Sequence, residues 1–180
     1  MTLDERLAAA RGGGAAGPVE SRGILRLAGK GARDFLHRIS TQHVAKLPAD
    51  GSTYAAFLDN HGHVVGEGLV VARPDDLLLL TEADEVPLLL PHLRKYLLAA
   101  PVRIDDASAE LAAMAVLGPA GVDRARAAAA GAPVTVAATP RRGVPAVEVV
   151  GPREALEALR DEHRPGLRFH PLISQNVSET

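Results

Sequence analysis

Glu67 is the residue whose type and surroundings in this 180-residue sequence most favour chemistry or ligand binding. It stands inside the apolar run from Val64 to Ala72, with a glycine on either side. Glycine within a strand often marks the close approach of a ligand or another backbone. Strict alternation places the Glu67 side chain on the face of Val65 and Leu69, where burying a carboxylate without a partner is costly. Either Glu67 lines a pocket, or its face is partly hydrated, or it pairs with an arginine.

A second candidate is the His61-x-His63 motif, whose two imidazoles would fall on one side of a strand end. A metal site would need a third ligand such as Asp59. Because side chains at a hairpin tip are usually only hydrated, we expect no metal ion there. The glycine run at residues 12–14 has no strand before it, so we interpret it as a flexible joint and not as a phosphate cradle.

The composition excludes several classes of function. Twenty Lys and Arg face 22 Asp and Glu, and the net charge of −2 does not suit a general nucleic-acid binder. There is no Cys, which excludes disulfides, thiolate metal sites and a Cys nucleophile. No apolar run reaches the roughly 18 residues of a membrane helix, and the first residues lack the apolar core of a signal peptide. We therefore expect a cytoplasmic protein that binds neither nucleic acid nor membranes.

The elements that must position these residues follow from hydrophobic periodicity and turn signals. We predict strands over residues 23–27, 53–58, 64–72, 77–81, 102–104, 110–117, 133–137 and 144–150. We predict helices over residues 2–11, 30–39, 82–99, 119–130 and 152–163. The second, third and fourth strands form an antiparallel meander, with a turn at Asp59–Gly62. Pro91 lies deep within a helical pattern, where we expect a kink or a break.

Helices do not alternate one to one with strands in this order, which favours an α+β fold over a doubly wound sheet. We predict two related mixed units with antiparallel sheets and packed helices. The expected boundaries are a helix and flexible linker over residues 1–19, a first unit over 20–107, a second unit over 108–164 and a tail over 165–180.

The residues from Gly23 to Val44 resemble the opening of the tetrahydrofolate-binding YgfZ/T-protein family. That family shows a strand, then Gly-Lys-Asp-Ala and Phe-Leu, then Thr-Asn-Asp-Val, and this sequence has Gly-Lys-Gly-Ala, Phe-Leu and Thr-Gln-His-Val in the same order. Further matching segments follow in family order over residues 54–64, 76–81, 92–96 and 115–120. Their order and spacing carry the resemblance, which spans about residues 22–160 and implies the family's α+β folate-binding core.

The resemblance implies tetrahydrofolate as the ligand and a pocket between the two units. Its walls would be the strand that bears Glu67 and the strand that bears Tyr54. Thr41 is a further candidate for binding the ligand, because it begins the segment that matches the family's Thr-Asn-Asp. Glu67 would supply the carboxylate beside the folate amine. Arg141 and Arg142 either face the glutamyl tail of a folate, since arginine pairs with carboxylates through two hydrogen bonds, or lie in a hydrated turn.

The departures from the family pattern decide between its functions. Aminomethyltransferases have an Asp pair where this sequence has Gly66-Glu67, and their Gly-Tyr-Thr-Gly-Glu-Asp-Gly motif would fall near residues 139–143, where no acid stands. The YgfZ signature with its Cys is absent, and we expect no C-terminal barrel because the sequence stops at Thr180.

We therefore expect a YgfZ-like folate-binding protein that is not a classical aminomethyltransferase. Its expected role is in iron–sulfur cluster assembly or repair, with client or assembly proteins as partners, or in one-carbon metabolism. The alternative is a degenerate scaffold domain of the same fold without folate chemistry, with an exposed face through which we would expect a homodimer. An aminomethyltransferase is the least favoured interpretation.

Overall fold

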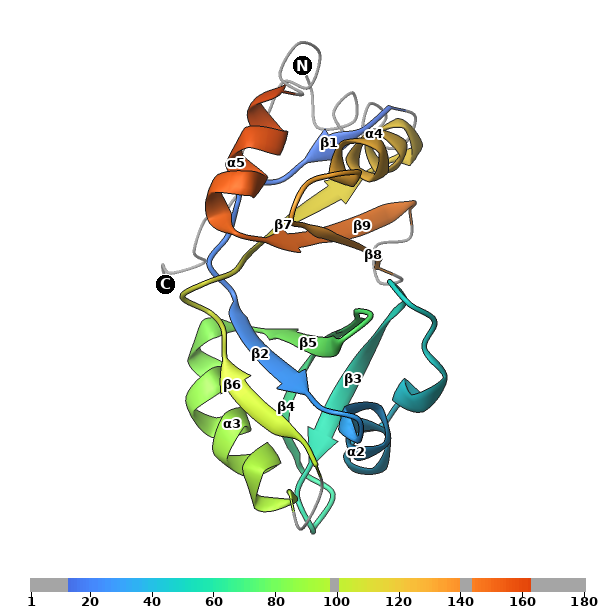
Figure 1. Ribbon diagram of the computed structural model, residues 1–180. Coiled ribbons are helices and arrows are strands. Elements are labelled where there is room, and N and C mark those ends of the chain that lie inside the picture. The colour runs from blue at the N-terminus through green and yellow to red at the C-terminus, as the bar shows by residue number, and fades with distance from the viewer. Residues whose placement is uncertain (1–12, 98–100, 140–143, 163–180) are drawn as a thin grey trace, which may run out of the picture.

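The computed structural model describes residues 13–97, 101–139 and 144–162, which form two antiparallel sheets stacked face to face with helices on their outer sides (Figure 1). This α-β-β-α layering confirms the prediction of an α+β fold with two mixed units. The predicted tail over 165–180 and the predicted helix over 2–11 lie outside the described residues.

The first sheet has the strand order β3-β4-β5-β2-β6. Its strands are β2 (Gly23–Ala28), β3 (Ser52–Leu58), β4 (Val64–Ala72), β5 (Asp76–Thr81) and β6 (Arg103–Asp106). Two helices cover its outer face, α2 (Ala32–Ile39) and α3 (Val86–Lys95), and two short 3-10 turns, η1 (Val44–Lys46) and η2 (Ala83–Glu85), precede β3 and α3. The predicted meander is confirmed, because β3, β4 and β5 are neighbours in the sheet.

The second sheet has the strand order β1-β7-β9-β8. Its strands are β1 (Ala15–Ala16), β7 (Ala112–Leu117), β8 (Thr135–Ala138) and β9 (Ala146–Gly151). The helices α4 (Pro119–Ala129) and α5 (Arg153–Glu162) cover its outer face. Pro119 begins α4, and Gly131 follows it with φ +91°, as expected where a helix ends in a left-handed residue.

The N-terminal part of the described chain belongs to the second sheet. Residues 15–16 pair with β7, and the N–H of Gly17 donates to the carbonyl oxygen of Ala115 at 2.7 Å. The sequence pattern had placed these residues in a flexible linker before the first unit. Pairing with β7 satisfies their backbone groups, and the whole first unit is therefore inserted between β1 and β7.

Helix α3 continues through Pro91, where we had expected a kink or a break. Leu89 and Leu93, which flank the proline, are fully buried against the first sheet. Their burial keeps both sides of the helix packed on the sheet, so the helix does not break even though Pro91 has no N–H to donate. The predicted helix over residues 82–99 is shorter than expected, because its first residues form η2.

A shared apolar core joins the two sheets. Its buried members come from both units: Ile24, Leu69, Val71, Leu78, Leu80, Ala107, Ala113, Ala137 and Val150. At one side an ion pair between Arg26 of β2 and Glu110, with 2.9 Å between Nη2 and Oε2, crosses from the first unit to the segment before β7. At another side the hydroxyl of Ser52 in β3 donates to the carbonyl oxygen of Ala138 in β8. Within the described residues, no helix is long and apolar enough to cross a membrane.

Candidate functional site

The structure brings Glu67 and Tyr54 together. Residue alternation in β4 turns the Glu67 side chain to the same face as Leu69, which belongs to the core between the sheets. Tyr54 of β3 pairs with Leu69 and packs against that same core. Its hydroxyl donates to Oε1 of Glu67 at 2.7 Å. Glu67 itself is exposed, so its carboxylate stands at the open rim of the space between the sheets.

Thr41 lies beside this pair but uses its side chain for the fold. Its N–H donates to the carbonyl oxygen of Ala56 at 3.1 Å, and its Oγ1 accepts from the N–H of Ala56 at 3.0 Å. Ala56 pairs with Glu67 in the sheet. Thr41 therefore covers the edge of β3 next to the candidate site, and its hydroxyl oxygen is already engaged with the backbone.

Thr81 supports the strand that carries Glu67, and the sequence did not single it out. It is buried at the end of β5, and its Oγ1 lies 2.8 Å from the main-chain oxygen of Glu67. The same hydroxyl contacts the carboxylate of Glu85 at the start of α3. Thr81 thus ties the backbone that carries Glu67 to the helix behind the sheet. A threonine that ends an apolar strand gives no local signal of such a contact.

Glu148 is a second acid that sequence reasoning missed. It lies in β9 between Ala115 and Ala137, and only 6% of its surface is exposed. Its neighbours Val147 and Val149 pack toward α4 and α5, whereas Ala137 and Val150 pack into the core between the sheets. Alternation therefore turns Glu148 toward the first sheet. A charged residue within an apolar strand, the signal that identified Glu67, also marked Glu148.

The other two predicted site residues, Arg141 and Arg142, lie outside the described residues. The chain on either side of them is described, with Thr139 buried just past the end of β8 and β9 beginning at Ala146. Their segment is therefore the connection between β8 and β9, the strand that carries Glu148.

The side chains at the tip of the β3–β4 hairpin hold the turn itself. Oδ1 of Asp59 accepts from the N–H of His61 at 2.8 Å and from the N–H of His63 at 2.9 Å. The hydrogen bond from the His63 backbone, followed by that from His61, holds the pKa of Asp59 below its usual value, although burial acts against this shift. Gly62 takes φ +84°, as the predicted turn requires. Within the described ranges, no group of three or more His, Asp or Glu side chains is placed to hold a metal ion.

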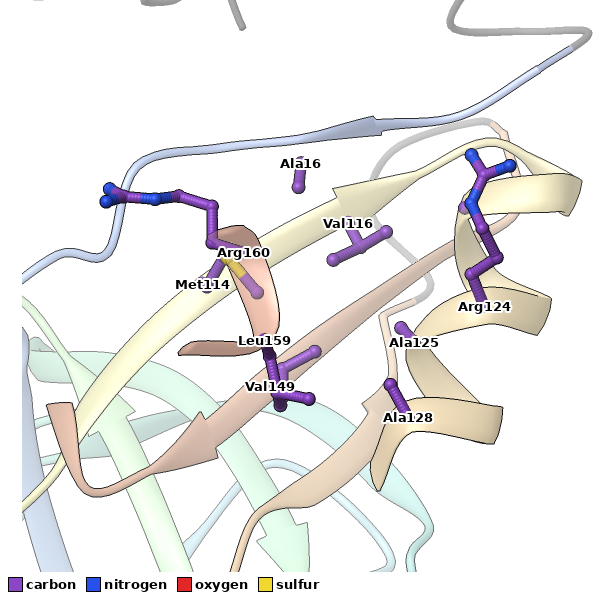
Figure 2. A pocket seen from close by; sticks show the side chains of 10 residues that line it. Ala16, Met114, Val116, Arg124, Ala125, Ala128, Val149, Leu159 and Arg160 are labelled. Carbon is purple, nitrogen blue, oxygen red and sulfur yellow. The ribbon is translucent and has the colours of Figure 1, made fainter. Parts of the chain in front are cut away.

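A pocket also lies away from the space between the units, on the outer face of the second sheet between α4 and α5 (Figure 2). The centre of the space between the units, where we predict the folate site, is filled by the shared aliphatic core. The lining of the pocket is mostly apolar or small and contains none of the predicted site residues: Ala16, Met114, Val116, Gly121, Arg124, Ala125, Ala128, Val149, Leu159 and Arg160.

Comparison with known proteins identifies the family. The family model of the GCVT N-terminal domain matches residues 6–155, which is most of the chain. The sequence itself has no significant match among curated proteins.

The fold is similar to that of a solved structure, the glycine cleavage system aminomethyltransferase T from Bartonella henselae. The TM-score is 0.72 at 15% identity, over 89% of this chain and 47% of that chain, so this chain spans about half the length of that protein. The heterotetrameric sarcosine oxidase from Corynebacterium sp. U-96 also aligns, with 19% identity over 88% of this chain and 92% of that chain, but its TM-score of 0.46 is too low to bear on fold or function.

Proposed function

Because the chain belongs to the GCVT N-terminal domain family, we propose that it binds a tetrahydrofolate-type ligand at the rim between its two sheets. One observation carries this proposal. Two carboxylates, Glu67 from the first sheet and Glu148 from the second, are on the faces that the sheets turn toward each other. The position between the units agrees with the one that the resemblance to the folate-binding family implies.

The chemistry of a reduced folate suits two facing acids. Its pterin ring presents an amino group and ring N–H groups, which a carboxylate accepts through paired hydrogen bonds. Glu148 is the buried acid, so it is the better reader of the pterin edge. Glu67 is exposed and held by Tyr54, which suits an acid beside the amine of the ligand. Arg141 and Arg142 follow β8 and would meet the glutamyl tail.

We propose further that the protein binds folate without classical aminomethyl transfer. A transferase must position a carboxylate on the reacting amine, and the family's transferases place an Asp pair where this chain has Gly66 and Glu67. Gly66 has no side chain, and its Cβ position faces Leu89 of α3 at 3.3 Å, on the face opposite the candidate site. We therefore favour a YgfZ-like role in iron–sulfur cluster assembly or repair, or in one-carbon metabolism, with client or assembly proteins as partners.

Calorimetric titration with tetrahydrofolate tests the binding proposal. We expect the full chain to bind, and we expect Glu67→Gln and Glu148→Gln each to weaken binding at least tenfold, because each removes an ionised acceptor. Glu154→Gln, at an exposed position on α5, is the matched control and should leave binding unchanged. Circular dichroism of every variant shows whether the fold is kept. No heat at near-millimolar ligand with the folded chain would overturn the proposal.

The aliphatic core between the sheets favours one alternative, a scaffold domain without folate chemistry. Leu69, Leu78 and Leu80 fill the centre of that space, so only its rim is open to a ligand. A scaffold of this kind would bury a standard protein interface, about 800 Å² per partner. Light scattering that shows a dimer, together with no folate heat, would favour the scaffold. A monomer that binds folate at all concentrations would exclude it.

A further inference from the structure

β8 is the outermost strand of the second sheet, and one of its two edges has no strand beside it (Figure 1). The phase of its pairing with β9 shows which backbone groups face that open edge. The N–H of Thr139 donates to the carbonyl oxygen of Ala146 at 3.1 Å, and such hydrogen-bonded pairs recur at every second residue of an antiparallel ladder. The intervening residues Val136 and Ala138 therefore direct their N–H and C=O groups away from β9.

Only two of the backbone groups at this open edge have a partner within the described residues. The same alternation turns Val134, just before β8, toward the edge. The N–H of Val134 donates to the carbonyl oxygen of Ala132 at 2.8 Å, and the C=O of Ala138 accepts from the hydroxyl of Ser52. Four groups have no hydrogen-bond partner in the described part of the chain: the C=O of Val134, the N–H and C=O of Val136, and the N–H of Ala138.

Each of the other three sheet edges carries a device that prevents strand pairing. Thr41 covers the edge of β3 through its two hydrogen bonds with Ala56. Three of the four residues of β6 are charged, and Nη2 of Arg94 donates to the carbonyl oxygen of Ile104 at 2.8 Å. β1 has only two residues. β8 reads Thr-Val-Ala-Ala, without charge or proline, so its edge is the one that remains open to another strand.

The pattern of free groups along β8 is self-complementary. An antiparallel copy related by a twofold axis at Val136 places Val136 opposite itself and Ala138 opposite Val134. Val136 then exchanges two hydrogen bonds with its copy, and each Ala138 N–H meets a Val134 C=O. The two groups that are already engaged, the N–H of Val134 and the C=O of Ala138, would face each other. This register therefore gives every free group a partner.

We propose that β8 pairs with β8 of a second copy of this chain, antiparallel about Val136, so that the two second sheets become one continuous sheet. The exposed Ala138 is small enough for another strand to approach. Helix α4 packs on β8 and β9, so its two copies approach each other across the axis, where the alanines at 127–130 take little room. The pairing uses the edge of the second sheet and does not rest on folate binding.

Sedimentation equilibrium of the full chain tests the pairing. We expect the mean mass to rise with protein concentration toward twice that of one chain. Val136→Pro removes the N–H that the second copy needs but keeps the ladder to β9, because that N–H points away from β9. We expect it to weaken dimerisation at least tenfold, whereas Val136→Thr keeps both the N–H and the branched shape and should dimerise normally. A natural chain that is monomeric up to near-millimolar concentration would overturn the proposal, as would an undiminished dimer of Val136→Pro that circular dichroism shows to be folded.

A charged side chain at the edge gives a second test that does not alter the backbone. Ala138→Lys should weaken dimerisation at least tenfold, because lysine on an edge strand opposes pairing. Ala83→Lys, at an exposed position in η2 of the first unit, is the matched control and should leave the dimer unchanged. An equal effect of the two lysines, whether loss or retention of the dimer, would place the contact elsewhere and contradict the proposal.

Single cysteines test the register, since the sequence has no Cys of its own. In the proposed pair the two Val136 Cα atoms lie about 5.5 Å apart, within the range of a disulfide. The two Ala138 Cα atoms lie about 13 Å apart along the strands, too far for one. We expect Val136→Cys to form a disulfide-linked dimer at least tenfold faster than Ala138→Cys, although Ala138 is the more exposed residue. Equal rates, or faster linking through residue 138, would overturn the proposed register.

Discussion

Asp59 is the residue whose ionisation the structure ties most directly to local stability. Its carboxylate accepts two backbone N–H groups in the β3–β4 hairpin, and its pKa is lowered from 3.8, first by the His63 backbone and then by that of His61. A folded pKa below the unfolded value stabilises the protein fully above about pH 4, and this contribution is lost as the pH falls through the folded pKa.

We therefore predict that Asp59→Asn is less stable than the natural chain at pH 6, and that the difference is smaller at pH 3, where the Asp59 contribution is already being lost. Urea denaturation at both pH values measures the difference. The pKa of Asp59, followed by its carboxyl carbon shift in NMR, should lie under 3.8. A stability difference that is the same at both pH values would contradict this account.

Thr81 offers a second prediction at the scale of one residue. Thr81→Val keeps the shape of the side chain but removes the hydroxyl near the Glu67 main-chain oxygen and the Glu85 carboxylate. Because Thr81 is buried, we expect a loss of about 1–2 kcal/mol in the free energy of unfolding. Thr53→Val is the control, since the Thr53 hydroxyl makes no hydrogen bond within the described ranges, and it should change stability by less than about 0.5 kcal/mol. Equal losses in both variants would contradict the contact.

At the scale of elements, β4 and β5 approach each other closely at Gly68. A Cβ at this position would come within 2.3 Å of the Leu80 backbone oxygen and 2.8 Å of Leu79 Cδ1. We expect Gly68→Ala to destabilise the protein by about 1–3 kcal/mol in urea denaturation, because the two strands must separate. Gly17→Ala is the matched control, since its closest contact would be 3.5 Å, and it should be nearly neutral. A neutral Gly68→Ala would show that the strands tolerate the separation.

The elements show how far the sequence alone predicts this fold. Periodicity located β4 correctly, because eight of its nine residues are apolar or small and Glu67 is the exception. It missed β1, since the pairing that makes two alanines a strand comes from β7, distant in the sequence. The helix does not break at Pro91, one of the two outcomes that the sequence predicted, since burial of Leu89 and Leu93 overrides local propensity.

Some residues of the candidate site could be named from the sequence, because they stand out within an apolar strand or match a family motif. Glu67 was identified from its apolar strand and Tyr54 from the family resemblance, and the structure joins them by a hydrogen bond. Glu148 carries an equal signal, a charged residue within an apolar strand, whereas the family motif predicts acids at residues 139–143, where this sequence has none. The pocket between α4 and α5 depends on how two helices are spaced on a sheet, and no local pattern encodes that spacing.

For the whole molecule, the shared core predicts cooperative unfolding. Leu80 of the first sheet and Val150 of the second belong to one buried cluster. We expect calorimetry to show a single transition with equal calorimetric and van't Hoff enthalpies. Leu80→Ala should lower the free energy of unfolding by about 2–5 kcal/mol and should speed global hydrogen exchange of Val149 in the second unit as well. Two separate transitions would show that the units are only loosely joined.

The insertion of the first unit between β1 and β7 has a consequence for synthesis on the ribosome. The nascent chain releases β1 about a hundred residues before its partner β7. At roughly 5–20 residues per second, that interval is on the order of 5–20 s. Every strand and helix of the first unit is translated in this time. Of the second sheet, only β1 has then been made, and its partner strand β7 is still missing. The second sheet can therefore be completed only after the first unit has been translated. Any delay in translation between β1 and β7 prolongs the time for which β1 has no partner strand.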